Sequence, residues 1–139
     1  MSTLDVFKKL HQAAANGDVS AQAELAKRYE TGDGTEIDLI QAFHYASLAA
    51  KNNDAESQNS LGVFYATGKG VEQNDALAIQ WFEKAAALGF EKASLNLARL
   101  YLNGLYKDKD KCISDLRQMT GLHEKDAKSL LKSINKRDN

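Results

Sequence analysis

The sequence repeats itself at an interval of 36 residues, and this repeat restricts the fold more than any other feature. Aromatic, aliphatic and small residues all recur at that offset. The recurring positions are Tyr29, Tyr65 and Tyr101; Leu25, Leu61 and Leu97; Ala26, Gly62 and Ala98; and Gly32, Gly68 and Gly104. Self-similarity at one such period is the signature of a solenoid, because a single unit cannot bury its apolar face and must stack on its neighbours.

Each unit contains two helices, because apolar residues recur at intervals of three and four in two separate stretches. In the best-formed unit, 61–88, Leu61 and Tyr65 share one helical face and Gly68 ends the pattern. Asn74 is the predicted N-cap of the second helix, and Asp38 is its counterpart one repeat earlier. Over the whole chain the predicted helices are 4–15, 19–30, 39–51, 55–66, 75–87, 91–102, 111–119 and 122–137.

The recurring positions are interpreted as structural. The alanine pairs Ala49-Ala50 and Ala85-Ala86 allow helices to approach closely, so a larger side chain there should cost about 1–3 kcal/mol. Tyr45 and Trp81 are predicted to fill the space between repeats. The loop glycines are expected to supply positive φ or a close approach of the backbone.

The same offset divides the chain into units. Residues 1–17 align with the second helix of a unit and form an N-terminal half-repeat, followed by repeat 1 at 18–53 and repeat 2 at 54–89. A degenerate repeat 3, 90–121, keeps an apolar stripe in its second helix but lacks the alanine pair. Residues 122–137 predict a C-terminal capping helix, which a solenoid needs to present a polar outer face. Its apolar stripe is Leu122, Ala127, Leu130, Leu131 and Ile134.

Composition and charge narrow the class of protein. The net charge is −1 and 27% of residues are charged, which favours neither nucleic acid nor a membrane surface as a partner. Cys112 is the only cysteine, so no intrachain disulfide can form, and this suits a reducing compartment. The N-terminus lacks a secretory pattern, and no segment is apolar over the length that a bilayer requires. We therefore expect a cytoplasmic protein.

Repeat 2 carries a recognisable motif between residues 57 and 89. Its residues are Leu61-Gly62, Tyr65, Gly68, Gly70-Val71, Ala78, Trp81-Phe82, Lys84-Ala85-Ala86 and Gly89. This motif closely resembles the Sel-one-like repeat, a branch of the α/α repeats related to the tetratricopeptide repeat, and the resemblance covers residues 1–106. The chain departs from the pattern where Thr35 replaces a valine and Tyr106 replaces a loop glycine.

The resemblance implies both a fold and a kind of function. The fold is an all-α, right-handed α/α solenoid with a C-terminal capping helix. The function is protein–protein interaction, as a small adaptor or scaffold. One alternative is an immunity protein that neutralises a cognate toxin by direct binding, and another is a hydrolase-like enzyme, which ranks last.

The sequence contains no constellation typical of catalysis. His11, His44 and His123 form no H-x-x-x-H pair, and a lone cysteine forms no C-x-x-C pair, so no zinc site is predicted. The glycine pairs at 32–34 and 68–70 follow helices rather than strands, unlike a dinucleotide-binding loop. We expect no metal ion, no cofactor and no enzymatic activity, and we expect Cys112 to be a buried structural residue.

The residues that do not recur are the candidates for function. In solenoids of this kind the first helix of each repeat lines the concave face. The predicted groove residues are Ala23, Lys27 and Glu30; Asn59, Val63 and Ala66; and Leu95, Arg99 and Leu102. We expect a peptide or protein segment to bind there, with Lys27 and Arg99 engaging acidic or backbone groups.

Two points about this groove stay open at the level of sequence. Leu95 and Leu102 are exposed if the groove is open, and exposed apolar patches usually mark contacts. Alternatively, the capping helix folds back and covers both. A second copy of the chain could also pair with the first, through the groove or through the lysine-rich capping helix.

Overall fold

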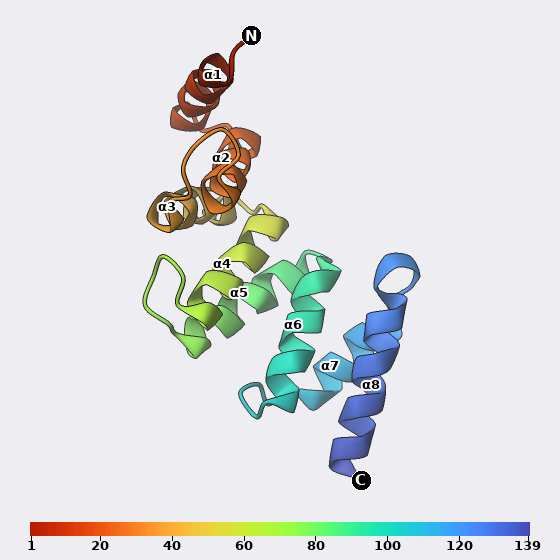
Figure 1. The fold of residues 1–139 in the computed structure, drawn as a ribbon. Helices are drawn as coiled ribbons and strands as arrows, with labels where there is room; N and C mark the ends of the chain where they lie inside the picture. The colour runs from red at the N-terminus through yellow and green to blue at the C-terminus, as the bar shows by residue number, and fades with distance from the viewer.

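The chain is an all-α solenoid, as predicted (Figure 1). A computed structural model describes all residues, 1–139. It contains eight α-helices and one short 3-10 turn: α1 (Thr3–Ala15), α2 (Val19–Thr31), α3 (Leu39–Lys51), α4 (Ala55–Thr67), α5 (Asp75–Ala87), α6 (Glu91–Leu102), α7 (Lys109–Arg117), η1 (Gly121–His123) and α8 (Glu124–Asp138). None of the helices combines the length and the apolar character needed to cross a membrane.

The helices form a stack of antiparallel hairpins that places the two termini at opposite ends of the molecule (Figure 1). The hairpins are α2–α3, α4–α5 and α6–α7, and each packs on the next. At the N-terminal end, α1 packs on α2. At the C-terminal end, α8 packs on both α6 and α7, so it takes the place that the first helix of a further repeat would have.

Side-chain caps fix where the helices begin. Asp18 and Asp54 each accept a backbone N–H bond at the start of a first helix. Asp38, Asn74 and Asp108 do the same at the start of the second helices, which confirms the predicted caps at Asp38 and Asn74. A capped N-terminus satisfies backbone donors that have no partner within the helix.

Repeat 3 differs from its prediction. Its second helix was predicted at 111–119, whereas α7 spans Lys109–Arg117. The cap Asp108 follows Asn74 by 34 residues rather than 36, because the connection after α6 is contracted. Tyr106, which stands where the other repeats have a glycine, is buried and donates a hydrogen bond to Glu83 at 3.0 Å.

The capping helix also begins later than predicted. Residues 121–123 form a 3-10 turn, and α8 then runs from Glu124 to Asp138. Leu122 was predicted to lie in the apolar stripe, but it is 87% exposed because it belongs to this turn. The stripe that packs on the solenoid consists of buried Ala127 and Ile134 with partly buried Leu130 and Leu131.

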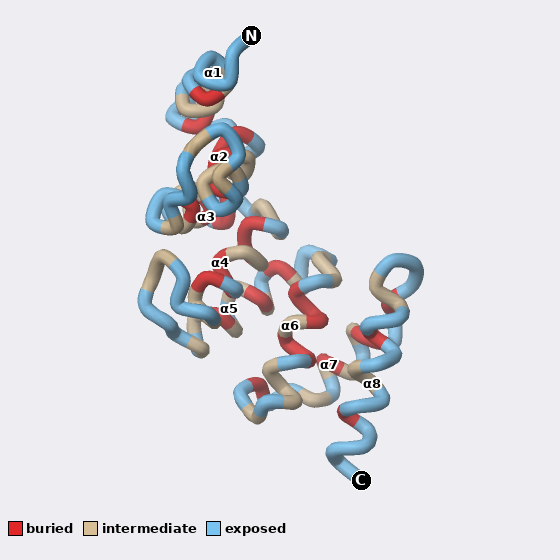
Figure 2. The backbone as a smooth tube through the Cα atoms, viewed as in Figure 1, coloured by how far each residue is buried: buried red, intermediate tan, exposed pale blue.

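The core follows the stack rather than a single centre, and Figure 2 shows buried residues on every hairpin. Three apolar clusters divide it, with 4 buried residues at the N-terminal end, 6 in the middle and 13 at the C-terminal end. The largest cluster joins α5 to α8. Apolar packing is therefore most extensive at the capped end.

One loop glycine is required for packing between repeats. Gly70 has φ +70°, and a Cβ atom there would lie 2.3 Å from the backbone oxygen of Leu39. The loop after α4 therefore rests directly on the start of α3. This is the close approach that the repeated glycines predicted.

Candidate partner-binding face

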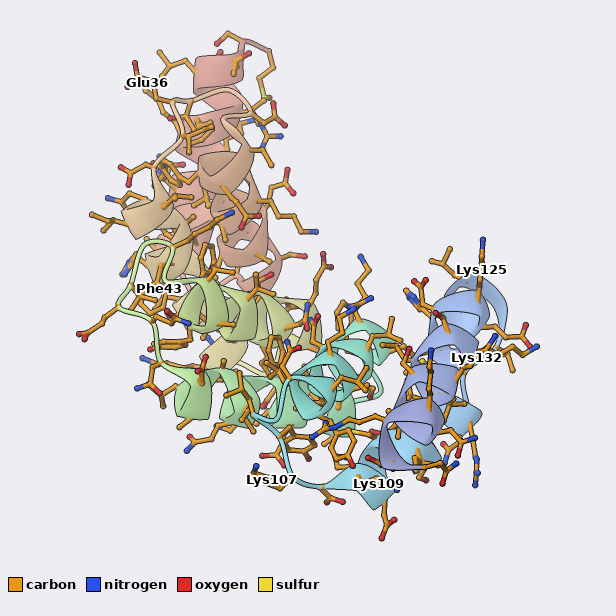
Figure 3. The ribbon with its side chains drawn as sticks, turned by 60° about the horizontal axis from the view of Figure 1, so that its bottom comes forward. Glu36, Phe43, Lys107, Lys109, Lys125 and Lys132 are labelled. Carbon is orange, nitrogen blue, oxygen red and sulfur yellow. The ribbon has the colours of Figure 1, made fainter.

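The nine predicted groove residues lie on the three first helices, α2, α4 and α6, and we call them the first-helix face. Their exposure is uneven. Lys27, Glu30, Val63 and Arg99 are exposed; Ala23, Asn59, Ala66 and Leu102 are half-buried; and Leu95 is buried. Figure 3 shows the side chains of the stack, with the capping helix marked by Lys125 and Lys132.

Leu95 is not available to a partner. It is only 3% exposed and belongs to the same apolar cluster as Ala127 and Ile134 of α8. Leu102 is partly buried against that cluster. Of the two alternatives left open by the sequence, the structure therefore shows that the capping helix packs against this end, and the first-helix face is open chiefly over α2 and α4.

Polar contacts connect the first helices across this face. The Lys27 Nζ lies 3.0 Å from Glu56 Oε1, which joins α2 to α4. The hydrogen bond to Glu56 raises the pKa of Lys27 above its ordinary value. Both side chains are more than half exposed, so this ion pair adds little stability. Lys27 is thus paired within the chain, while more than half of its side chain stays exposed.

A second contact joins α4 to α6. Asn96 Nδ2 donates to Asn59 Oδ1 at 3.0 Å, and Arg99 Nη1 donates to Asn96 Oδ1 at 3.3 Å. Arg99 forms no salt bridge, so its charge is not neutralised within the chain. Asn96 and Glu56 could not be predicted from the sequence, because their neighbours on this face lie on other helices.

Three equivalent positions form a row across the face: Lys27, Val63 and Arg99, each 36 residues from the next. The middle position is apolar, and Val63 is 38% exposed. A hollow beside the row, between α2 and α4, is lined by Ala23, Lys27 and Glu30 together with Glu56 and Ser60. The row presents an exposed apolar side chain at its centre and, at Arg99, a guanidinium that forms no salt bridge and can pair with a carboxylate.

Two of the reactive side chains, Cys112 and His11, are held in structural environments. Burial raises the pKa of the Cys112 thiol to about 12, with Asp115 and Asp108 adding to the effect, so little nucleophilic thiolate forms near neutral pH. His11 lies between two tyrosines, 3.0 Å from the Tyr29 hydroxyl and 3.1 Å from the Tyr45 hydroxyl. No group of three or more His, Cys, Asp or Glu side chains is placed to hold a metal ion.

Two buried glutamines complete the recurring contacts. Gln22 and Gln58 are 36 residues apart, and their Nε2 atoms donate to the carbonyls of Ala14 and Ala50 at 3.1 and 3.2 Å. Each therefore satisfies the C-terminal end of the preceding second helix. The 36-residue offset also relates these two glutamines, but polar residues are not part of the apolar and glycine pattern from which the repeat was predicted.

The chain belongs to the Sel1 repeat family. The family model matches residues 19–54, 55–90 and 92–114. Sel1 repeat proteins are generally protein-interaction modules and mainly non-enzymatic scaffolds. The resemblance inferred from the sequence is confirmed.

Solved structures give the same result. A protective antigen from uropathogenic Escherichia coli strains, with an SLR fold, is 36% identical over 80% of this chain and 24% of its own, with a TM-score of 0.74. A Sel1 repeat protein from Oxalobacter formigenes is 28% identical over 78% of this chain and 46% of its own, with a TM-score of 0.71. Helicobacter pylori cysteine rich protein B is 33% identical over 67% of this chain and 70% of its own, with a TM-score of 0.63.

The chain thus spans less than half of the length of the first two of these structures. Comparison with curated proteins finds no significant match.

Proposed function

We propose that this protein is a small cytoplasmic adaptor or scaffold that holds a segment of another protein on its first-helix face. The observation that carries the proposal is the row Lys27, Val63 and Arg99. These positions are equivalent in the repeat, yet they differ in chemistry while the buried positions around them recur. Variation on an exposed row over a repeated core is what partner selectivity requires.

The chemistry of the row defines the partner segment. Val63 offers an exposed apolar contact on α4, and Arg99 offers a guanidinium without a carboxylate partner. The bound segment therefore carries an apolar side chain with an acidic group next to it. The buried, reduced Cys112 supports a reducing compartment such as the cytoplasm.

Affinity purification with quantitative mass spectrometry tests the proposal. The wild-type chain is compared with the double variant Val63→Asp/Arg99→Glu, which places negative charge where the acidic segment would bind. The expected result is that specific partners are lost from the double variant, each at least about tenfold, since removal of one good contact changes affinity by that factor.

A matched control makes the same chemical changes on a second helix. Ile40→Asp/Lys51→Glu replaces an exposed isoleucine and an exposed lysine on α3. This variant should retain the partners. If both double variants give the wild-type set of partners, the first-helix face is not the binding site. A single partner copurifying in equal amount would favour the narrower role of an immunity protein, and several weaker partners would favour an adaptor.

A further inference from the structure

The outer face of α1 leaves open a set of positions that the following repeats bury. On α3 these positions hold Ala42, Ala46 and Ala49, and on α5 they hold Ala78, Phe82 and Ala85; none is more than 2% exposed. On α1 the equivalent residues are Val6, Leu10 and Ala13, which are only half-buried. In repeat 2 the cover is the first helix of the same repeat, because Phe82 packs on Gly62 of α4. No helix of residues 1–139 covers Leu10 in this way.

The uncovered positions form part of a hollow between α1 and α2. Its volume is about 490 Å³, and Val6, Leu10 and Ala13 line it together with Met1 and Ala21. Met1 is 82% exposed. The hollow is therefore an apolar seat for one helix, of the kind that α2 and α4 fill on α3 and α5.

Charges of opposite sign lie on the two sides of this hollow. Lys9 lines it on α1, and it forms no salt bridge within the chain. On the other side it is lined by Asp18, the N-cap of α2, and by Glu24 on α2. Glu24 already pairs with Arg28 at 2.9 Å but keeps 43% of its side chain exposed. A surface that carries both signs on opposite rims can be complementary to itself.

We propose that two copies of the chain pair through this hollow, with α1 packed against the α1 of the partner copy about a two-fold axis. The seat requires an amphipathic helix with an unpaired apolar face, and α1 is itself such a helix. A two-fold axis satisfies both copies at once, because each α1 then covers the same apolar positions on the other copy.

The two-fold axis also determines which charged residues of the two copies meet. Antiparallel pairing brings Leu10, the middle residue of the uncovered set, next to its own copy. It brings Lys9 to the side of the partner's Glu24. The C-terminal end offers no comparable seat, because α8 buries its apolar stripe on α6 and α7. This inference concerns a different surface from the first-helix face and does not rest on the proposed function.

Sedimentation velocity of the full chain, from low micromolar to high micromolar concentration, tests the pairing. The wild-type chain should shift from monomer to dimer. Lys9→Glu should raise the dissociation constant about tenfold, since the axis places each altered contact in the interface twice. Lys8→Glu is the matched control: it makes the same change of charge on the neighbouring exposed residue, outside the hollow, and should leave the constant unchanged. A wild-type chain that stays monomeric throughout would overturn the proposal.

A charge exchange and a cross-link locate the interface. Glu24→Lys alone should weaken the dimer like Lys9→Glu, and an equal mixture of the two variants should form a heterodimer. Leu10→Cys should give a disulfide-linked dimer under mild oxidation, because only residues close to the axis bring two copies of one Cα within about 7 Å. The native Cys112 is 2% exposed and does not compete. A dimer that neither exchanges charge nor cross-links would place the interface elsewhere and contradict the proposal. Val63→Asp/Arg99→Glu should leave the dimer intact, which separates this test from that of the first-helix face.

Discussion

Repeats 1 and 2 have helices of equal length and equivalent caps, yet they fill the space between their helices differently. In repeat 1 two positions hold alanines, Ala26 and Ala46, which belong to the same buried apolar cluster. In repeat 2 the same two positions hold Gly62 and Phe82, and a Cβ atom on Gly62 would lie 2.4 Å from the Phe82 ring. A loss of one methyl group on α4 thus accompanies a gain of a whole ring on α5. The fold therefore constrains the combined volume of the two side chains rather than the size of either residue alone.

The two repeats also differ on the side of the second helix that faces the previous repeat. Tyr45 stacks on Tyr29 with ring centroids 5.9 Å apart, and His11 hydrogen-bonds to both hydroxyls. The equivalent of Tyr45 in repeat 2 is Trp81, which Lys84 covers at 4.5 Å. Repeat 1 is thus held on this side partly by polar aromatic contacts, while in repeat 2 Trp81 packs on the middle apolar cluster and is covered by a cation.

The largest expected effect is at Phe82. Phe82→Ala removes a ring that is 2% exposed and should lower the free energy of unfolding by about 3–5 kcal/mol. The equivalent change in repeat 1, Ala46→Gly, should cost only about 1 kcal/mol through helix propensity. Urea denaturation followed by circular dichroism measures both. Equal losses at the two sites would show that the repeats are not packed differently.

The next largest effect is expected for Gly62→Ala, and whether it lowers or raises stability should depend on the residue at position 82. Gly62→Ala places a methyl group against the Phe82 ring and should destabilise the wild-type chain by about 1–3 kcal/mol. In the Phe82→Ala background the same change recreates the alanine pair of repeat 1. There it should stabilise by up to about 1 kcal/mol, because alanine favours a helix over glycine. Additive effects in a double-mutant cycle would contradict this coupling.

A smaller effect on stability is expected when the equivalent tyrosines of the two repeats, Tyr29 and Tyr65, each lose their hydroxyl. Tyr29→Phe removes the hydroxyl that bonds to His11 at 3.0 Å and should cost about 0.5–1.5 kcal/mol. Tyr65→Phe is the matched control, since it makes the same change one repeat later, where the structure shows no side-chain hydrogen bond. The difference between the two midpoints of denaturation is the measurement. If the midpoints agree, the histidine bridge does not stabilise repeat 1.

The smallest effect concerns the ion pair that crosses from repeat 1 to repeat 2. Glu56→Gln removes the partner of Lys27 and should cost no more than about 0.5 kcal/mol, because both groups face solvent. Even this loss should shrink in high salt, which screens exposed charges. Denaturation at low and high salt measures it. A loss that is large and independent of salt would show that the pair acts through packing instead of charge.

Most of the architecture could be predicted because it depends on local patterns. Residues such as Asp38 and Asn74 mark where helices begin by their own hydrogen bonds. The burial of Leu95 could not be predicted in this way, because it depends on where α8 docks, nearly 30 residues further along the chain. The early start of α7 was missed because the offset of 36 was carried past a contraction that only the position of Asp108 reveals. The contacts of Glu56 and Asn96 on the first-helix face need the helices placed in space.

The contraction before Asp108 also has a consequence for how such a chain can grow. Between Asp18 and Gly70 the side-chain caps, the buried glutamines and the loop glycines recur at the 36-residue offset, so a further block of 36 residues inserted there would meet equivalent surfaces on both sides. Downstream the step is broken, and α8 fills the next position. Duplication within this stretch can therefore lengthen the first-helix face by one row at a time while the packing of α8 on α6 and α7 stays the same.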